Sequence, residues 1–237
     1  MTIEAEWWDY DDAGELAEAI AGDIGFIIDS ALDARGAALI ALPGGKTPVA
    51  ALDLIAAQKR KWKDVTIIPT DDRIVEVTSP LSNVAMLAKK FLPLGARVIP
   101  LTGGAAAADY KMSGKAADAR LADLPFPLDL VWLGMGVDGH TASIFPGPDL
   151  DEALNGPKER RALGVMPDPM PADAPVARVT LSKAAILGAR SLTIAITGAD
   201  KRAVLERAIA EGPGSAVPIG RVLGDSDLAV DIHWAEG

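Results

Sequence analysis

The hydrophobic and polar positions of the chain fall into two patterns that alternate. Short runs rich in apolar and β-branched residues predict strands at residues 38–42, 65–70, 97–101, 128–134, 176–181, 192–197 and 228–234. Between them, apolar residues recur at spacings of three and four, which predicts helices at residues 13–32, 47–57, 83–91, 105–121 and 201–210. Strands that alternate with helices are typical of βαβ units and a parallel sheet.

Several of the predicted strands are continuously apolar, as strands buried on both faces are. We therefore expect an α/β fold with a doubly wound, mostly parallel sheet and helices on both faces, Rossmann-like in arrangement, formed by residues 1–237 as one domain. The proline-containing segment 149–174 has neither pattern, and we expect it to run over the surface as a loop. Ligands of such sheets bind outside the carboxyl ends of the strands, so the loops that leave the strands are the candidate sites.

Composition narrows the classes of function. The 237 residues are 49% hydrophobic and 24% charged, close to the average of globular proteins. The absence of cysteine excludes disulfides, a thiol nucleophile and thiolate metal sites. The acidic N-terminus lacks the features of a signal peptide and no apolar run is long enough to span a bilayer, so a cytoplasmic protein is expected. The net charge of −10 argues against nucleic acid or an anionic membrane as partner and leaves small molecules as the expected ligands.

A glycine-rich turn, PGGKTP at residues 43–48, follows the first predicted strand and precedes a helix. Gly44 and Gly45 let the backbone approach a ligand, and a helix N-terminus presents free N–H groups, so the turn is a candidate phosphate site. Thr47 is a natural N-cap or hydroxyl donor. A nucleotide-binding loop of the Walker type is disfavoured, because Ile40 stands where that motif requires glycine. An ordinary β-to-α turn without a ligand is the alternative.

Three charged residues stand at the end of the strand at 65–70. Asp71, Asp72 and Arg73 follow it directly, and a parallel strand delivers such residues into the ligand crevice. A guanidinium there can clamp a phosphate or stabilise an oxyanion. The alternative is a solvated turn with a local ion pair. We expect the Ser-Asn pair at 82–83 to be a structural N-cap.

The segment GMGVDGHTASIFPG at residues 134–147 carries Asp138 and His140 among glycines, directly after a buried strand. A neutral imidazole, with an ordinary pKa near ~6.5, is well matched to taking a proton from water at neutral pH, and Asp138 can hold its tautomer. The other histidine, His233, lies in the last predicted strand and is expected to be structural. No G-x-S-x-G elbow is present, which favours a water nucleophile. Prolines follow soon after the glycines, which disfavours a dinucleotide site.

These motifs, with RVTLS at residues 178–182 and TGADKR at 197–202, stand in the order found in the 6-phosphogluconolactonase family, which the chain resembles from Pro43 to Lys201. GMGVDGHTASIFPG is the most specific of them. The resemblance implies a fold shared with glucosamine-6-phosphate deaminases and ribose-5-phosphate isomerases. It also implies hydrolysis of a small-molecule sugar-phosphate lactone, 6-phosphogluconolactone, in the oxidative pentose phosphate pathway, with no cofactor and no metal.

The resemblance further implies roles for individual residues. His140 resembles the general base, Arg73 and Lys201 resemble ligands of the phosphate or of the developing charge, and the glycine turn resembles the phosphate seat. Asp71 and Arg178 complete the set of expected site residues. The division of the three cations between phosphate and oxyanion stays open at this point, as does the choice between a monomer and a small homo-oligomer.

The chain departs from the family pattern in places, and two other functions compete. Lys46 stands where many relatives have a smaller or different residue, and Asp72 replaces the commoner glutamate, which leaves details of substrate preference open. A deaminase-like isomerase is one alternative, but those relatives have glutamate where this chain has Phe145. A sugar-phosphate-sensing module is the other, but such proteins add a DNA-binding domain, and this chain shows no basic recognition helix.

Overall fold

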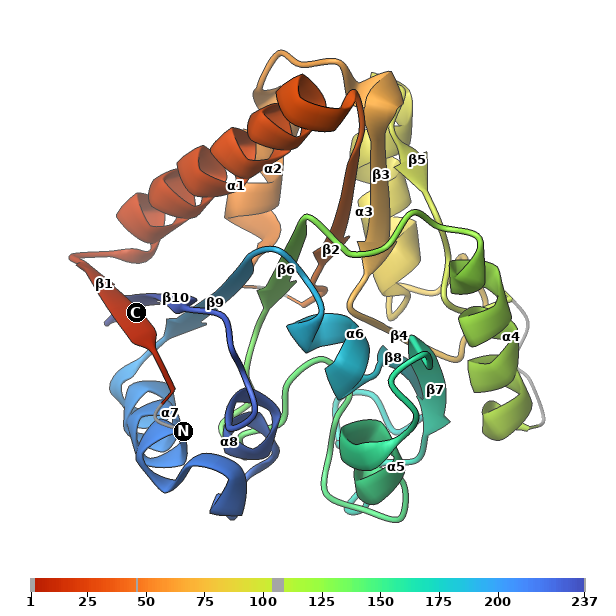
Figure 1. The fold of residues 1–237 in the computed structure, drawn as a ribbon, viewed down its shortest axis with the longest axis vertical. Coiled ribbons are helices and arrows are strands. Elements are labelled where there is room, and N and C mark those ends of the chain that lie inside the picture. The colour runs from red at the N-terminus through yellow and green to blue at the C-terminus, as the bar shows by residue number, and fades with distance from the viewer. Residues whose placement is uncertain (1–2, 46, 104–108, 237) are drawn as a thin grey trace.

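The computed structural model describes residues 3–45, 47–103 and 109–236, and its centre is a parallel sheet (Figure 1). Seven strands lie in the order β1-β10-β9-β6-β2-β3-β5, and each neighbouring pair is parallel. Their bounds are β1 Ala5–Tyr10, β2 Ala38–Leu42, β3 Val65–Pro69, β5 Arg97–Val98, β6 Leu130–Leu133, β9 Leu192–Thr197 and β10 Val230–Ala235. The chain winds outward from β2 in one direction and from β6 in the other, so the predicted doubly wound sheet is confirmed.

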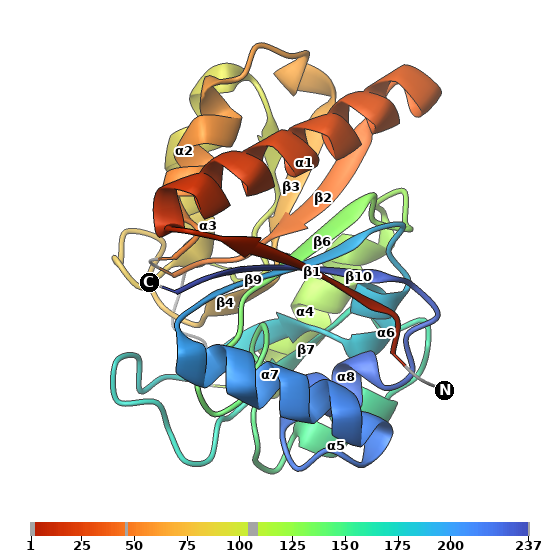
Figure 2. The same cartoon turned by 90° about the vertical axis from the view of Figure 1, so that its left-hand side faces the viewer.

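Helices cover both faces of this sheet, and each face has its own hydrophobic core (Figure 2). The first face carries α1 (Ala13–Arg35), α2 (Val49–Ala57) and α3 (Asn83–Phe91). The second carries α4 (Tyr110–Ala122), α5 (Leu150–Asn155), α6 (Lys183–Leu187), α7 (Ala199–Glu211) and α8 (Pro218–Leu223). Short 3₁₀ turns lie at Trp62–Asp64, Leu92–Leu94 and Gly212–Gly214. No helix in the described ranges has the length and apolar character needed to cross a bilayer.

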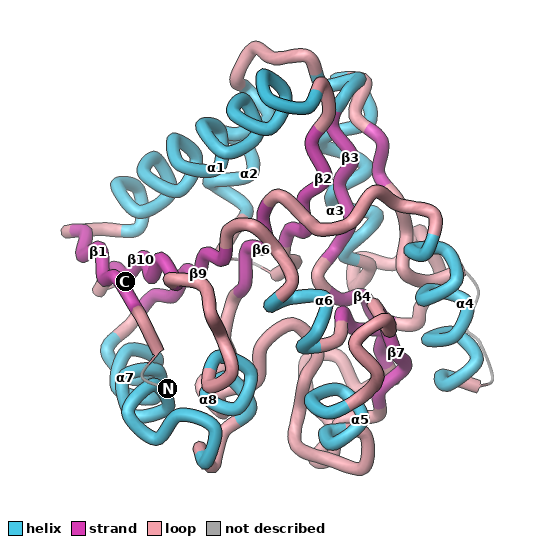
Figure 3. The backbone as a smooth tube through the Cα atoms, viewed as in Figure 1, coloured by secondary structure: helices cyan, strands magenta, loops and turns pink. Residues whose placement is uncertain are grey.

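A second, antiparallel sheet lies beside the first, in the order β4-β8-β7 (Figure 3). Its strands are β4 (Asp71–Arg73), β7 (Ala162–Val165) and β8 (Arg178–Leu181). The predicted strand at 176–181 is therefore real, but it pairs outside the parallel sheet. Because β4 follows β3 after a single residue, the small sheet begins at the carboxyl edge of the large one.

The segment 149–174 is not the surface loop that the sequence predicts. It contains α5 and β7, and all four residues of β7 are buried. The four-residue strand is too short for a periodic pattern, and it is stabilised by antiparallel pairing with β8 and by packing on α4. The edge strand β1 was also not predicted, because two of the six residues in its sequence AEWWDY are acidic. Residues 105–108 of the predicted helix lie outside the described residues.

Two glycines allow β7 and α4 to pack backbone against backbone. A Cβ atom added at Gly164 of β7 would lie 1.8 Å from the carbonyl oxygen of Tyr110 in α4. A Cβ atom added at Gly114 of α4 would lie 1.9 Å from the backbone nitrogen of Gly164. Backbone atoms cannot move aside as a flexible side chain can, so this contact requires glycine on both sides.

We expect Gly164→Ala to lower the free energy of unfolding by at least ~1 to 3 kcal/mol, because the added methyl group overpacks a rigid contact. Chemical denaturation of the purified variant measures this loss. Gly22→Ala is the matched control: Gly22 lies inside α1 with nothing within 4 Å of the added methyl group. That substitution should raise stability by ~0.5 to 1 kcal/mol through helix propensity. A Gly164 variant as stable as the parent protein would show that β7 does not need this close approach.

Candidate active site

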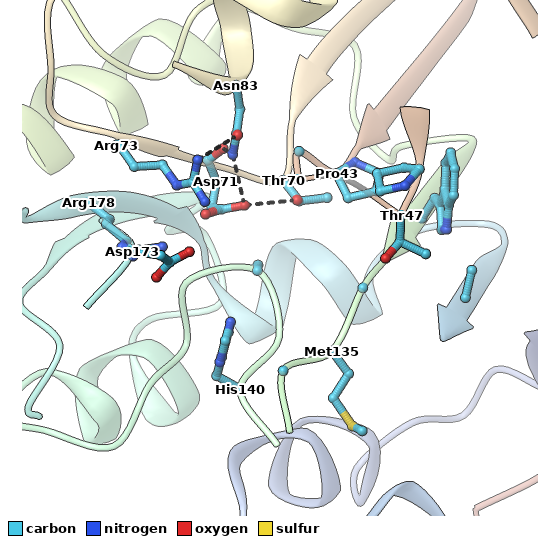
Figure 4. A pocket seen from close by; sticks show the side chains of 18 of the residues that line it. Pro43, Thr47, Thr70, Asp71, Arg73, Asn83, Met135, His140, Asp173 and Arg178 are labelled. Carbon is cyan, nitrogen blue, oxygen red and sulfur yellow. Dashed lines mark hydrogen bonds between the residues drawn. The ribbon is translucent and has the colours of Figure 1, made fainter. Parts of the chain in front are cut away.

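A cavity of about 280 Å³ lies at the carboxyl edge of the parallel sheet, where the loops after β9, β6, β2 and β3 converge (Figure 4). These four strands are neighbours in the sheet, so their loops must emerge side by side. The residues that they contribute to its wall include Pro43, Gly44, Gly45, Thr47, Thr70, Asp71, Arg73, Gly134, Met135, Gly136, His140 and Lys201. Arg178 and Asp173 are contributed by β8 and the segment before it.

The glycine turn after β2 forms one wall of the cavity. Gly45 has a φ of 95°, in the left-handed region that favours glycine. Gly44 lies against α3, where an added Cβ atom would be 1.9 Å from Oδ1 of Asn83. Gly45 is therefore favoured by its backbone conformation and Gly44 by the close approach of the Asn83 side chain, and both let the turn approach a ligand in the cavity.

Thr47 lines the cavity but is not the N-cap of α2. Pro48 occupies the N-cap position, the helix begins at Val49, and no side chain caps it. The expectation that Thr47 caps the helix is therefore wrong: Pro48 already adopts a helical φ of −75°, so the helix end is displaced by one residue. The Thr47 side chain faces the cavity (Figure 4), which leaves its second predicted role as a hydroxyl donor open. Lys46 lies outside the described residues.

The charged triplet after β3 divides its side chains between the cavity and the interior. Asp71 and Arg73 line the cavity, whereas Asp72 is fully buried, as the alternation of side chains along β4 requires. The Asp72 carboxylate accepts hydrogen bonds from the backbone N–H groups of Arg73 at 2.9 Å, Asn83 at 2.7 Å and Val84 at 3.4 Å. It thereby ties β4 to the N-terminus of α3. Burial raises the pKa of Asp72 to about 6, although these backbone hydrogen bonds act to lower it.

Asp71 is held by three residues from three different parts of the chain. The Ser143 hydroxyl donates to Asp71 Oδ2 at 2.5 Å, and Thr70 Oγ1 donates to Asp71 Oδ1 at 3.3 Å. The amide nitrogen of Asn83 donates to the backbone oxygen of Asp71 at 2.8 Å, and its amide oxygen accepts from Arg73 Nη1 at 3.2 Å. Asn83 therefore belongs to the cavity wall as well as to the start of α3.

His140 and Asp138 form a hydrogen-bonded pair in the loop after β6. Asp138 Oδ1 lies 2.5 Å from Nδ1 of His140 and also accepts from the His140 backbone N–H at 3.2 Å. Partial burial acts to raise the pKa of Asp138, but the hydrogen bonds and charge of His140 outweigh it, so this pKa lies below its ordinary value. An ionised Asp138 accepts the Nδ1 proton, which leaves the lone pair of a neutral imidazole at Nε2.

The loop that carries His140 is fixed from both sides. The backbone oxygen of Gly139 accepts from the N–H of Ile219 at the start of α8, at 2.9 Å. Thr141 Oγ1 donates to the backbone oxygen of Gly134 at 2.8 Å. Ala142 between His140 and Ser143 has a φ of 47°, a left-handed conformation that alanine adopts at some cost in energy. A strained residue inside a well-anchored loop is typical of functional sites.

Two arginines lie side by side at one end of the cavity. Arg73 of β4 and Arg178 of β8 are direct partners in the antiparallel pairing. Arg178 is buried, its Nη2 donates to the backbone oxygen of Ala174 at 3.1 Å, and burial lowers its pKa. The Nε atoms of both arginines are buried without a hydrogen-bond partner among the described residues. Two guanidiniums with spare donors are suited to an anion or to a developing negative charge.

Lys201 supplies a cation from a different strand end. It lies in the first turn of α7, directly after β9, and burial lowers its pKa. Because β9 is separated from β3 by β6 and β2, Lys201 and Arg73 enter the cavity from different sides. The glycine turn and the His140 loop emerge between them.

The structure brings the predicted site residues together at one cavity. Gly44, Gly45, Thr47, Asp71, Arg73, His140, Arg178 and Lys201 all line the cavity, and Asp138 contacts it through His140. His233 is buried elsewhere, beside Tyr10. The sequence predicts first a structural role for Asn83, as part of an N-cap, and does not identify Trp132 or Asp173; all three line the cavity. The one feature of the sequence that could have pointed to Trp132 is its indole in an otherwise aliphatic strand. Within the described ranges, no three histidine or acidic side chains converge as a metal site would require.

Comparison with known proteins places the chain in a family. Residues 11–234 match the model described as glucosamine-6-phosphate isomerases/6-phosphogluconolactonase. A 6-phosphogluconolactonase of Mesorhizobium japonicum is 36% identical over 233 residues, which cover 97% of this chain and 94% of that protein. A crystal structure of a 6-phosphogluconolactonase from Shewanella baltica superposes with a TM-score of 0.88 at 31% identity, covering 99% of this chain and 100% of the other. A monomeric glucosamine-6-phosphate deaminase shares the fold, with a TM-score of 0.78 at 16% identity and 98% of each chain covered.

The raised pKa of Asp72 predicts a specific dependence of stability on pH. The pKa of about 6 lies above the ordinary 3.8, so the folded protein holds this proton more tightly than the unfolded chain. The contribution of Asp72 to the free energy of unfolding is therefore greatest below pH ~4. It declines by roughly 2 to 3 kcal/mol as the pH rises to ~6.

Asp72→Asn removes this titration while its amide oxygen keeps an acceptor for the backbone. Urea unfolding of both proteins between pH 4 and 7 should show the variant gaining stability relative to the parent as the pH rises. A difference that stays constant across this range would mean that Asp72 titrates at its ordinary pKa.

Proposed function

The chain belongs to the family of glucosamine-6-phosphate isomerases and 6-phosphogluconolactonases, and on this basis we propose that it hydrolyses 6-phosphogluconolactone with His140 as the general base. The reaction opens the lactone ring to 6-phosphogluconate in the oxidative pentose phosphate pathway, and the enzyme is a carboxylic ester hydrolase. The observation that carries the assignment of the base is the Asp138–His140 pair at the wall of a cavity that contains three cations.

The first step is the attack of water on the lactone carbonyl. Asp138 accepts the Nδ1 proton of His140, so Nε2 is the atom that takes a proton from the attacking water. The water oxygen forms a bond to the carbonyl carbon, and the carbonyl electrons move to its oxygen. The guanidinium of Arg178 packs on the same phenyl ring as the His140 imidazole, and Arg73 is the pairing partner of Arg178, so both guanidiniums are suited to stabilise this oxyanion.

The second step is the opening of the ring. The oxyanion collapses, the bond between the carbonyl carbon and the ring oxygen breaks, and the ring oxygen leaves with that electron pair. The imidazolium of His140 returns its proton to the leaving oxygen, and the carboxylic acid product then ionises in water. One water is consumed and the histidine is restored, so the cycle requires no other reactant.

The phosphate of the substrate is proposed to lie at the opposite end of the cavity, with Lys201 and the glycine turn. Pro43 and Thr47 lie across the cavity from Arg73 and Arg178 (Figure 4), and Lys201 follows β9, which β6 and β2 separate from β3. The turn at Gly44 and Gly45 lets backbone groups approach a phosphate, and the ammonium of Lys201 supplies charge. This arrangement separates the phosphate from the reacting carbonyl along the length of the sugar.

The deaminase-like alternative is disfavoured by the residue at position 145. Phe145 stands where the deaminase-like pattern has glutamate, and its ring stacks on His140, so the carboxylate that the deaminase reading requires is replaced by an apolar group. The cytoplasmic location, the lack of nucleic-acid and membrane partners, the single domain and the oligomeric state stay predictions.

A coupled assay tests the function directly. Glucose-6-phosphate dehydrogenase generates the lactone in situ, and the rate of its disappearance is compared with and without the purified protein. Acceleration above spontaneous hydrolysis, unchanged by a chelator, is the expected result. A rate equal to the spontaneous one would rule out the proposed activity.

For His140→Ala we expect kcat to fall by ~10² to 10⁴, the usual contribution of a positioned general base, with little change in KM. His233→Ala is the matched control, because it removes the other histidine, which is not among the residues that line the cavity. If that control is destabilised by the loss of its buried contacts, His233→Gln serves instead. A His140 variant that retains nearly full kcat would remove this residue from the mechanism.

The proposed separation of the cations predicts different kinetic effects for Lys201 and Arg73. Lys201→Met should weaken binding of the phosphorylated lactone by ~10- to 100-fold through KM and spare hydrolysis of unphosphorylated gluconolactone. Arg73→Met should lower kcat for both substrates, by ~10² if it loses one oxyanion donor. The opposite pattern, with Arg73 acting on KM for the phosphorylated substrate alone, would reverse the orientation of the sugar.

A further inference from the structure

The ring of Phe145 contacts the two groups that the proposed reaction places at the lactone carbonyl. Its centroid lies 4.0 Å from the centroid of the His140 imidazole, with an angle of 22° between the ring planes. The guanidinium carbon of Arg178 lies 5.0 Å from the centroid of the same phenyl ring. His140 and Arg178 are therefore no farther apart than the sum of these two distances, and Phe145 is the side chain that they share.

Phe145 is itself held rigidly. Its side chain is buried, and it follows Ile144, whose N–H donates to the backbone oxygen of Thr141 at 2.9 Å. Ser143, two residues before it, is tied to Thr180 and to Asp71 by hydrogen bonds of 3.1 Å and 2.5 Å. A side chain in such a setting has little freedom, so it can limit the freedom of the groups stacked on it.

The hydrogen bonds of His140 and Arg178 leave one motion of each group unrestrained. Asp138 holds His140 at Nδ1, which allows the imidazole to swing about that contact and displace Nε2. The guanidinium of Arg178 donates through Nη2 to Ala174, while its Nε has no partner among the described residues. A flat ring against each group opposes these motions, because both a stacked imidazole and a guanidinium are attracted to an aromatic face.

We propose that Phe145 is a positioning residue, whose aromatic face sets the orientation of the His140 imidazole and of the Arg178 guanidinium relative to one another. The proposal rests on the proposed function for the role of these two groups. Phe145 then contributes to kcat although it does not itself contact the substrate. Side-chain volume alone does not supply this contribution, because an aliphatic group offers no π face to either partner.

The test compares Phe145→Leu, which removes the aromatic face, with Phe145→Tyr, which keeps it. Phe126→Leu is the matched control: Phe126 also lies beneath an arginine, Arg161, at 4.3 Å, but does not line the cavity. Thermal melting first establishes that each variant is folded, and Phe145→Met replaces the leucine variant if that one is not. The kinetic constants are then measured with phosphorylated and unphosphorylated lactone.

A second readout is independent of activity. Proton NMR of the imidazole ring reports the ring current of a phenyl group stacked on it, and the chain has only two histidines, so the signals are assigned with His140→Ala. The ring current should be lost in Phe145→Leu, retained in Phe145→Tyr and unaffected in Phe126→Leu. This measurement remains valid even if the lactonase assay of the parent protein fails, so the stacking can be tested separately from the function.

The expected kinetic result is a fall in kcat of about 10- to 100-fold for Phe145→Leu with both substrates, the scale of a small misplacement of catalytic groups, and little change in KM. Phe145→Tyr should restore most of this loss, and Phe126→Leu should leave both constants unchanged. A folded Phe145→Leu variant with the kcat of the parent protein would overturn the proposal, as would an equal loss in Phe126→Leu. An unchanged imidazole signal in Phe145→Leu would overturn it at the level of structure.

Discussion

The lateral pairing of four parallel strands is the constraint on which the rest of the site depends. Strands β9, β6, β2 and β3 are hydrogen-bonded neighbours that all run in one direction, so the loops that follow them emerge at one edge. Those loops carry Lys201, His140, the glycine turn and Arg73, which are far apart in the sequence. The parallel topology therefore brings together Lys201, Arg73 and His140, whereas the third cation, Arg178, is brought to the cavity by the antiparallel pairing of β8 with β4.

Buried polar contacts then convert this convergence into a defined geometry. Asp72 joins β4 to the start of α3, and the neighbouring Asn83 bridges Asp71 and Arg73. On the opposite wall, Ser143 connects the His140 loop to Asp71. Each of these groups is satisfied only when two separate segments are in place, so the interactions act together and give the cavity walls a fixed shape.

The electrostatics of the cavity are opposite to those of the whole chain. The protein carries a net charge of −10, yet in its cavity the three cations Arg73, Arg178 and Lys201 outnumber the two carboxylates Asp71 and Asp173. Burial lowers the pKa of Arg178 and of Lys201, which reflects the energetic cost of placing cations away from water. An anionic ligand in the cavity would offset this cost, which accounts for the presence of partly desolvated cations there. Dissolved salt screens the charge of the acidic surface residues, so their electrostatic effect on the cavity is limited to short distances.

The sequence by itself determined the α/β class, most strands of the large sheet and the loops that carry the chemistry, because apolar periodicity and strand-end motifs are local properties. Only the tertiary structure decided that β8 leaves the parallel sheet and that β7 is a buried strand, since both depend on antiparallel pairing and on the Gly114–Gly164 contact. It also decided that Asn83 and Phe145 adjoin the site. Asn83 contacts Asp71 and Arg73, and Phe145 contacts Arg178, on other segments of the chain, and no local pattern encodes contacts between side chains that the fold alone brings together.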